Sequence, residues 1–168
     1  LAAGSGAGVQ GVIFYMTIYM VMSVGTFACI LAMRRHGRMV EQISDLAGLS
    51  RTQPLLALVL AIFMFSMAGI PPLAGFFGKF YVFMAAVEAG LIGLAIIGVL
   101  ASVVGAFYYL RIIKVMYFDE AAEPFDRPTG GILVTLLWGS GGFILLFAAF
   151  ADQILAVTTA AAQALYLG

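Results

Sequence analysis

The chain has 168 residues, of which 64% are hydrophobic and 10% are charged, and its mean hydropathy is +1.11. This composition excludes an ordinary water-soluble domain and is typical of a protein embedded in a lipid bilayer. The formal net charge at pH 7 is zero, so the charge balance gives no reason to expect a nucleic-acid partner.

The first apolar stretch runs from residue 12 to residue 33 and contains no charged residue. Its length suits a helix with a rise of about 1.5 Å per residue that crosses a bilayer core of about 30 Å. A basic cluster, Arg34-Arg35-His36-Gly37-Arg38, follows it directly. The polar segment 39–53 then carries apolar residues at helical spacing, which predicts a short helix at the membrane surface.

The second apolar region, 54–87, is too long for one straight span. A helix over this region would be about 51 Å long, against a bilayer core of about 30 Å. It forms either two short spans or one span with an irregular middle. The third stretch, 89–110, is followed by Arg111 and Lys114. A single crossing in 54–87 places these residues on the same side as the Arg34 cluster, as the excess of basic residues on the cytoplasmic side requires. We therefore interpret 54–87 as one discontinuous span.

The last predicted span covers 131–151, which gives an all-α integral membrane protein with four transmembrane helices. The loops 34–53 and 111–128 are then expected on the cytoplasmic side. The tail 153–168 either extends the last helix or lies at the membrane surface. The chain begins without Met and without a basic leader region, so we expect it to be the C-terminal part of a longer polypeptide.

The second span is interrupted by the double proline Pro71-Pro72. Because proline has no backbone N–H, the carbonyls of Met67 and Ala68 lose the partners that a continuous helix would give them. Irregular backbone at membrane depth is tolerated only where protein buries it or water reaches it, and broken helices recur at the ion sites of transporters. The predicted break runs from Pro71 to Gly78, and the residues that interrupt the helix are Gly69, Pro71, Pro72, Gly75 and Gly78.

Lys79 is the only charged residue within the long apolar stretches. A lysine at the centre of a membrane helix costs roughly 2.5–3.5 kcal/mol on insertion scales. One interpretation is a proline kink that only shapes packing, with Lys79 extending to the membrane surface. The coincidence of prolines, glycines and lysine favours an ion or proton path instead, because an amine in apolar surroundings can exchange its proton near neutral pH. Ser66, Thr26 and Ser102 are the polar residues available to hold water on such a path, and the alternative for each is ordinary packing between membrane helices.

The run Met67-Ala-Gly-Ile-Pro-Pro-Leu-Ala-Gly-Phe-Phe-Gly-Lys-Phe-Tyr81 resembles the discontinuous late helix of the antiporter-like subunits of proton-pumping NADH:quinone oxidoreductase, respiratory complex I. The segments Asp45–Arg51 with Pro54, and Tyr108–Arg111, are similar to the N-type subunit. The resemblance implies a subunit of about fourteen transmembrane helices, of which this chain is the last four. It places Lys79 on the family's lysine in the broken twelfth helix, a member of a proton relay in the middle of the membrane.

The resemblance implies proton translocation as part of complex I in the bacterial inner membrane, coupled to NADH oxidation by quinone in other subunits. The expected partners are lipid and the other membrane subunits, including adjacent antiporter-like ones. The chain would thus belong to an enzyme, a translocase, yet hold no redox site itself. We expect no cofactor and no metal, because Cys29 and His36 are the only cysteine and histidine.

The other relay members of the family, a Glu–Lys pair and a central lysine, belong to earlier helices, so this segment would not complete a proton path alone. Two alternatives stay open. The first is a subunit of a multi-subunit cation/proton antiporter with the same helix architecture. The second is a structural scaffold that transports nothing, in which Lys79 binds a lipid headgroup or a carboxylate of a neighbour.

Overall fold

The computed structural model describes residues 2–126 and 130–166, and most of these residues are helical. The predicted all-α membrane fold is confirmed, apart from one very short hairpin near the first basic cluster. The helices and strands are, in chain order, α1 (Gly6–Ala32), β1 (Arg34–Arg35), β2 (Arg38–Met39), the 3-10 helix η1 (Ile43–Leu46), α2 (Leu49–Thr52), α3 (Pro54–Ala68), α4 (Ala74–Glu88), α5 (Ile92–Phe118) and α6 (Gly131–Tyr166).

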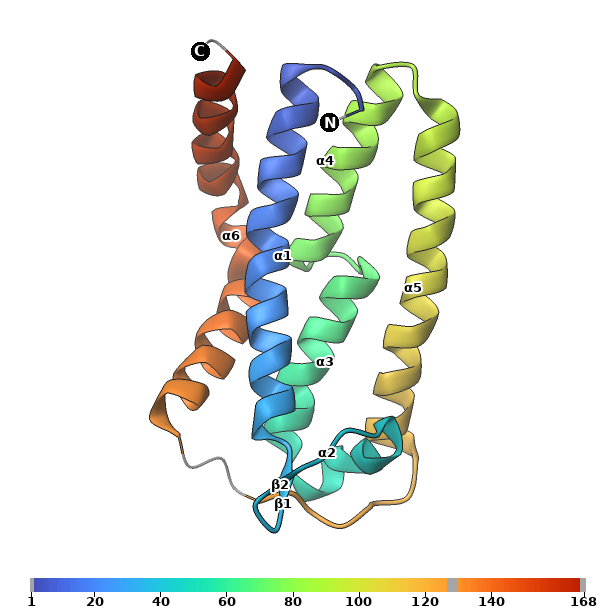
Figure 1. The fold of residues 1–168 in the computed structure, drawn as a ribbon, viewed down its shortest axis with the longest axis vertical. Helices are drawn as coiled ribbons and strands as arrows, with labels where there is room; N and C mark the ends of the chain where they lie inside the picture. Colours follow the sequence, from blue (N-terminus) through green and yellow to red (C-terminus); the bar gives the residue numbers. More distant parts are fainter. Residues whose placement is uncertain (1, 127–129, 167–168) are drawn as a thin grey trace.

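Helices α1 and α5 run in one direction and α3, α4 and α6 run in the other, and α1 lies between α6 and the pair α3 and α4 (Figure 1). Three helices, α1, α5 and α6, are each long and apolar enough to cross a membrane. The helices are longer than the apolar stretches that predicted them, because hydropathy marks the membrane core and not the helix ends. Arg111 and Lys114 therefore lie in the last turns of α5 and not in a loop. The tail extends the last helix, since α6 continues to Tyr166.

The second apolar region is divided into two helices that lie end to end beside α1, with a connecting segment across the middle of the molecule (Figure 1). Helix α3 ends at Ala68 and α4 begins at Ala74. The helix is therefore interrupted at 69–73, which corrects the predicted limits of Pro71 to Gly78. Gly75 and Gly78 are helical residues of α4.

The segment between α1 and α3, within which a short surface helix was predicted, contains short helical turns in place of one regular helix. It forms the β1–β2 hairpin, η1 and the single turn of α2. Gly48 is the reason that the helix is interrupted, since its backbone is left-handed with φ +62°. The Gly48 N–H donates to the carbonyl of Val115 at 3.1 Å, and a Cβ at Gly48 would lie 2.4 Å from the Cα of Ala121. The contact with the end of α5 therefore requires glycine here.

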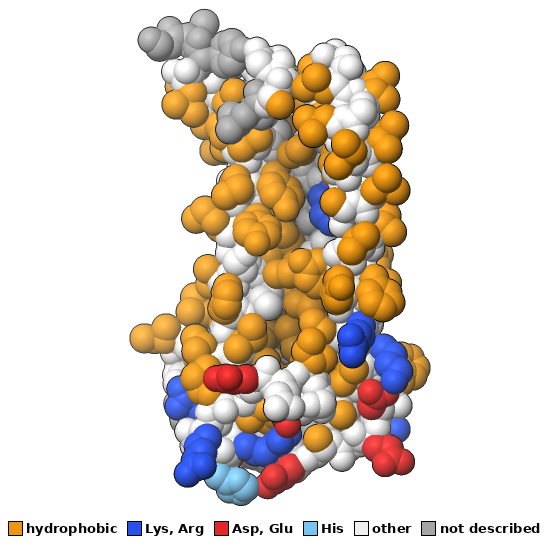
Figure 2. All heavy atoms as spheres, turned by 45° about the vertical axis from the view of Figure 1, so that its right-hand side comes forward, with side chains coloured by type: hydrophobic (Ala, Val, Ile, Leu, Met, Phe, Trp, Pro, Cys, Tyr) orange, Lys and Arg blue, Asp and Glu red, His pale blue; other side chains and the backbone are white. Residues whose placement is uncertain are grey.

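The core lies along α1, where buried side chains such as Phe14 and Ile18 meet Phe63 of α3 and Phe147 of α6. Helix α5 packs against α3 and α4 but leaves most of its apolar side chains exposed. Charged side chains gather at the end of the molecule that carries the hairpin, and apolar side chains cover most of the visible remainder (Figure 2). This distribution suits a molecule surrounded by lipid or by neighbouring membrane helices.

Candidate functional site at the helix break

The C-terminus of α3 has the geometry that commonly ends a helix at glycine. Gly69 is left-handed with φ +86°. The N–H groups of Gly69 and Ile70 donate to the carbonyls of Ser66 and Phe65, at 3.0 and 3.1 Å. This pair of hydrogen bonds is a Schellman motif, which satisfies two of the four carbonyls that a helix end leaves without partners. The last two carbonyls of α3 remain.

The Lys79 side chain provides the partners for those last two carbonyls. Its Nζ donates to the carbonyl oxygens of Met67 and Ala68, at 2.8 and 3.4 Å. Because Pro71 and Pro72 have no backbone N–H, these two carbonyls lack the donors that a continuous helix would give them. The ammonium group therefore lies at the C-terminal end of α3, where the helix dipole is negative, and makes charge-assisted hydrogen bonds across the break.

Glycines bring α4 close enough for this contact. The Gly75 N–H donates to Ser66 Oγ at 3.0 Å, and a Cβ at Gly75 would lie only 1.9 Å from the Ser66 carbonyl oxygen. Ser66 is completely buried, and its hydroxyl donates to Met22 Sδ on α1 at 3.1 Å. A Cβ at Gly78 would lie 3.0 Å from the Tyr15 ring on α1. Gly75 and Gly78 thus allow close helix packing, which explains why they belong to α4 and not to the break.

Lys79 is half-buried beside a groove of about 380 Å³ between α4 and α5. Lys79 is the only titratable side chain among the described residues that line this groove, and Ser102 is the only other polar one. In the part of the chain that the structure describes, no carboxylate contacts Lys79. The remaining groove-lining residues are small or apolar: Ala68, Gly69, Phe76, Phe80, Phe83, Met84, Val87, Val99, Val103 and Ala106.

The three polar residues proposed for a water path lie in three different environments. Only Ser102 lines the groove beside Lys79. The Ser66 hydroxyl is buried among α1, α3 and α4 and is already hydrogen-bonded on both sides. The Thr26 hydroxyl donates to the carbonyl of Met22 at 2.8 Å, and Thr26 lines a separate cavity of about 270 Å³ that also contains Glu41. A continuous water path through these three residues stays a prediction.

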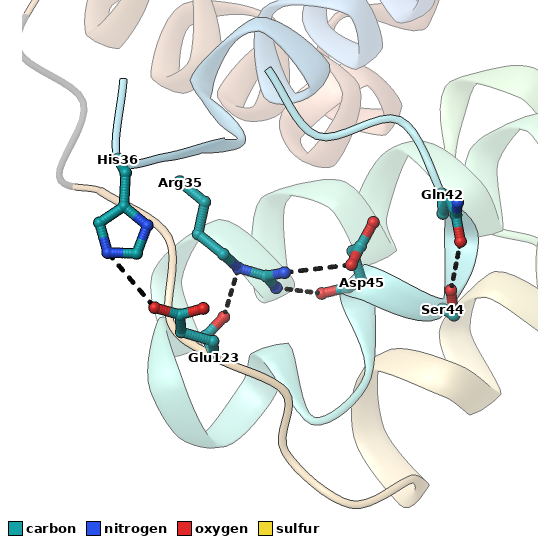
Figure 3. A network of polar contacts seen from close by, with 6 residues as sticks. All are labelled: Arg35, His36, Gln42, Ser44, Asp45 and Glu123. Atoms are coloured by element: carbon teal, nitrogen blue, oxygen red, sulfur yellow. Dashed lines mark hydrogen bonds and ion pairs between the residues drawn. The ribbon is translucent and has the colours of Figure 1, made fainter. Parts of the chain in front are cut away.

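A second polar site, which was not predicted from the sequence, centres on Arg35 (Figure 3). The guanidinium binds the Asp45 carboxylate at 3.1 Å and the Asp45 carbonyl at 3.3 Å, while Nε donates to the Glu123 carbonyl at 3.0 Å. The group also lies 5.1 Å from the centroid of the Phe125 ring. Arg35 therefore joins the segment after α1 to the segment after α5. The only hint in the sequence is that the loops 34–53 and 111–128 were expected on the same side of the membrane.

The hairpin turn next to Arg35 binds the same segment through backbone groups. His36 and Gly37 both have positive φ, as a two-residue type I′ turn requires. Their N–H groups donate to the Asp126 carboxylate at 3.3 and 2.8 Å. The His36 ring also lies 3.5 Å from the Glu123 carboxylate (Figure 3). Residues 127–128 of the predicted loop are outside the described residues.

Comparison with known proteins adds relatives of high similarity. NADH-quinone oxidoreductase subunit N of Parvibaculum lavamentivorans is 63% identical over 165 residues, which are 98% of this chain and 34% of that protein. The protein of the same name from Rhodospirillum rubrum is 59% identical over 165 residues, again 98% of this chain and 34% of that protein. The chain thus spans about a third of the length of these curated relatives.

Two solved structures share the fold. Respiratory complex I from Thermus thermophilus with bound aureothin matches with a TM-score of 0.74 and 30% identity, over 88% of this chain and 34% of that chain. The Mrp complex from a Dietzia species matches with a TM-score of 0.84 over 98% of this chain and 39% of that chain. Its identity is 23%, so this second match shows a shared fold alone.

A family model described as "NADH:quinone oxidoreductase/Mrp antiporter, TM" matches residues 1–105, which is more than half of the chain. With three helices long enough to cross a bilayer, the chain is an integral membrane protein. It belongs to the NADH:quinone oxidoreductase/Mrp antiporter transmembrane family.

Proposed function

We propose that this chain is part of an N-type antiporter-like subunit of a proton-pumping NADH:quinone oxidoreductase, and that Lys79 takes up and releases a proton in the membrane. The observation that carries the proposal is the placement of Lys79. Its amine lies at the break between α3 and α4, holds only neutral carbonyl acceptors, and borders an apolar groove. Charged residues within a membrane are costly and are usually retained for ion or proton transfer.

We propose that α3 and α4 form one discontinuous transmembrane span, which makes four spans in all. Each helix has 15 residues, and a helix of that length measures only about 22 Å at about 1.5 Å per residue. Either helix alone is therefore shorter than a bilayer core of about 30 Å, whereas the two in sequence are long enough. The gathering of charged side chains at one end supports a cytoplasmic position for the loops after α1 and α5 (Figure 2).

The energy for transport would come from NADH oxidation by quinone in other subunits, as the names of the relatives suggest. In this proposal the chain binds no redox cofactor, and its task is to hold and move a proton at Lys79 Nζ. A proton must reach and leave that atom through charged or hydrated groups on other helices. The natural partners are the remaining membrane subunits of the complex and the rest of the N-type subunit, in a bacterial inner membrane.

Replacement of Lys79 tests the proposal in the full-length subunit within the assembled complex, reconstituted in vesicles. Lys79→Met is expected to leave assembly intact and to lower the rate of proton translocation at least several-fold. Lys79→Arg keeps a positive charge that is not released near neutral pH, so it should also lose translocation. Normal proton pumping in Lys79→Met would contradict the proposed relay role of Lys79. Full recovery in Lys79→Arg would favour the scaffold, in which Lys79 serves only as a fixed charge.

The second candidate is a subunit of a multi-subunit cation/proton antiporter. The family name covers both kinds of protein, and the fold likeness to the Mrp complex extends over 98% of the chain. Purification of the native complex separates the two candidates, because redox subunits would accompany an NADH:quinone oxidoreductase and only membrane subunits would accompany an antiporter.

A further inference from the structure

The ends of helices α3 and α4 share one capping motif but differ in what packs against the glycine of that motif. Helices α3 and α4 both have 15 residues, and each is followed by a left-handed glycine: Gly69 with φ +86° directly after Ala68, and Gly90 with φ +76° after Ala89. The hydrogen bonds also correspond. Ile70 N–H donates to the carbonyl five residues before it at 3.1 Å, and Leu91 N–H does the same at 2.9 Å. Both ends are Schellman motifs.

The difference between the two glycines is what lies against their α-carbons. A Cβ at Gly90 would meet nothing within 4 Å. A Cβ at Gly69 would lie 3.2 Å from Cδ and 3.5 Å from Nζ of Lys79. The lysine side chain therefore passes over the α-carbon of Gly69 to reach the Met67 and Ala68 carbonyls. We name these two carbonyl oxygens the carbonyl seat.

We propose that Gly69 is a positioning residue for the proton-exchanging amine. Its missing side chain leaves the space through which Lys79 reaches the carbonyl seat, in addition to allowing the left-handed backbone. Carbonyl oxygens accept a hydrogen bond more strongly from an ammonium than from a neutral amine, so the seat is matched to the protonated lysine. A displaced amine would change the geometry from which each proton transfer starts. This inference rests on the proposed function.

The experiment uses the full-length subunit in the assembled complex in vesicles, with four variants: Gly69→Ala, Gly69→Asn, Gly90→Ala and Gly90→Asn. Alanine strains the left-handed backbone equally at both positions, whereas asparagine tolerates that conformation better. At position 69, however, asparagine crowds Lys79 more than alanine does. Backbone strain and crowding of Lys79 therefore change in opposite directions between the two Gly69 variants.

If Gly69 positions Lys79, Gly69→Asn should pump protons roughly threefold to tenfold more slowly per assembled complex than the wild type, and no faster than Gly69→Ala. Both Gly90 variants should pump close to the wild-type rate per assembled complex. If Gly69→Asn instead pumps as well as Gly90→Asn, the glycine serves only the backbone and the positioning role is overturned. Lys79→Met is measured in the same series. Normal pumping there refutes the proposed relay, while loss there with normal Gly69→Asn pumping refutes only the positioning role.

A stability measurement covers variants that assemble poorly. The cost of Gly69→Ala in thermal stability should exceed that of Gly90→Ala in the native sequence. In a Lys79→Ala background, which removes the crowding side chain, the two costs should become equal. A Gly69→Ala cost that is unchanged by Lys79→Ala would show that the lysine and the glycine are not coupled, and would refute the inference.

Discussion

The helix break and the Arg35 site both hold a buried or half-buried cation, yet with different kinds of partners. Arg35 faces a carboxylate, two carbonyls and an aromatic ring, and its side chain is only 18% exposed. Lys79 faces two carbonyls beside an apolar groove, with no carboxylate contact in the described part of the chain. A compensated guanidinium that never loses its charge serves structure. An uncompensated amine on neutral acceptors is suited to exchange its proton, and this contrast guides the predictions.

The largest effect should follow from Gly75→Ala, which disrupts the packing of α4 against the end of α3. The added Cβ would lie 1.9 Å from the Ser66 carbonyl oxygen. This oxygen is a backbone atom, so a change of side-chain rotamer cannot relieve the clash. We expect a loss of about 3 kcal/mol or more in stability, visible as failed incorporation of the subunit into the complex. Gly139→Ala is the control, because its Cβ would meet nothing within 4 Å. It should assemble normally, and equal behaviour of the two variants would contradict the packing described here.

Arg35→Ala should disrupt the Arg35 site without changing proton transfer at Lys79. It removes charge-assisted hydrogen bonds to the segments after both α1 and α5, so we expect it to cost about 2 kcal/mol. Arg35→Lys should recover only part of this, because an ammonium does not reproduce the forked geometry. Complexes that do assemble should pump protons normally. Reduced pumping per assembled complex would mean that the Arg35 site has more than a structural task.

Ser66→Ala distinguishes a structural hydroxyl from one on a water path. The change leaves the Gly75 N–H buried without its acceptor, for which we expect a cost of about 1.5 kcal/mol. Proton translocation per assembled complex should stay near normal. A selective loss of translocation in Ser66→Ala, with stability unchanged, would restore the water-path interpretation for this residue.

Lys114→Gln should have the smallest effect and shows what a cation contributes outside both sites. Lys114 pairs with Asp119 near the end of α5, but its side chain is 63% exposed. Exposed pairs of this kind contribute little, so the change in stability should be below about 0.5 kcal/mol. Unfolding of the purified complex measures it, and a change comparable to that of Arg35→Ala would show that exposure does not separate the two cations.

Some of the site could be predicted because it follows from local chemistry. The missing proline N–H groups identify the Met67 and Ala68 carbonyls as groups that need partners, and the isolated charge identifies Lys79. That Lys79 itself reaches those carbonyls depends on the packing of α4 against α3, which no local pattern encodes. The limits of the break were wrong for a related reason. Gly75 and Gly78 were expected to weaken the helix, but contacts with Ser66 and Tyr15 require glycine inside it.

The Arg35 site could not be predicted because its partners come from segments far apart in the sequence. Arg35 and Glu123 are brought together only when α1 and α5 end on the same side. Similarly, Gly48 breaks the expected surface helix because of a contact with Ala121 that exists only in the folded chain. The helix ends were displaced for another reason, since Arg111 and Lys114 are good helix formers and α5 continues through them.

The acceptors of Lys79 are main-chain atoms, and this has a consequence for how the protein tolerates mutation. Every amino acid carries a carbonyl, so no substitution at position 67 or 68 can delete the acceptor that Lys79 uses. A saturation mutagenesis screen should therefore find these two positions permissive within the limits of their side-chain packing. Positions 69 and 79 should be restrictive. The two carbonyl acceptors of Lys79 would therefore not be detectable from the mutational profile of positions 67 and 68, which supply them.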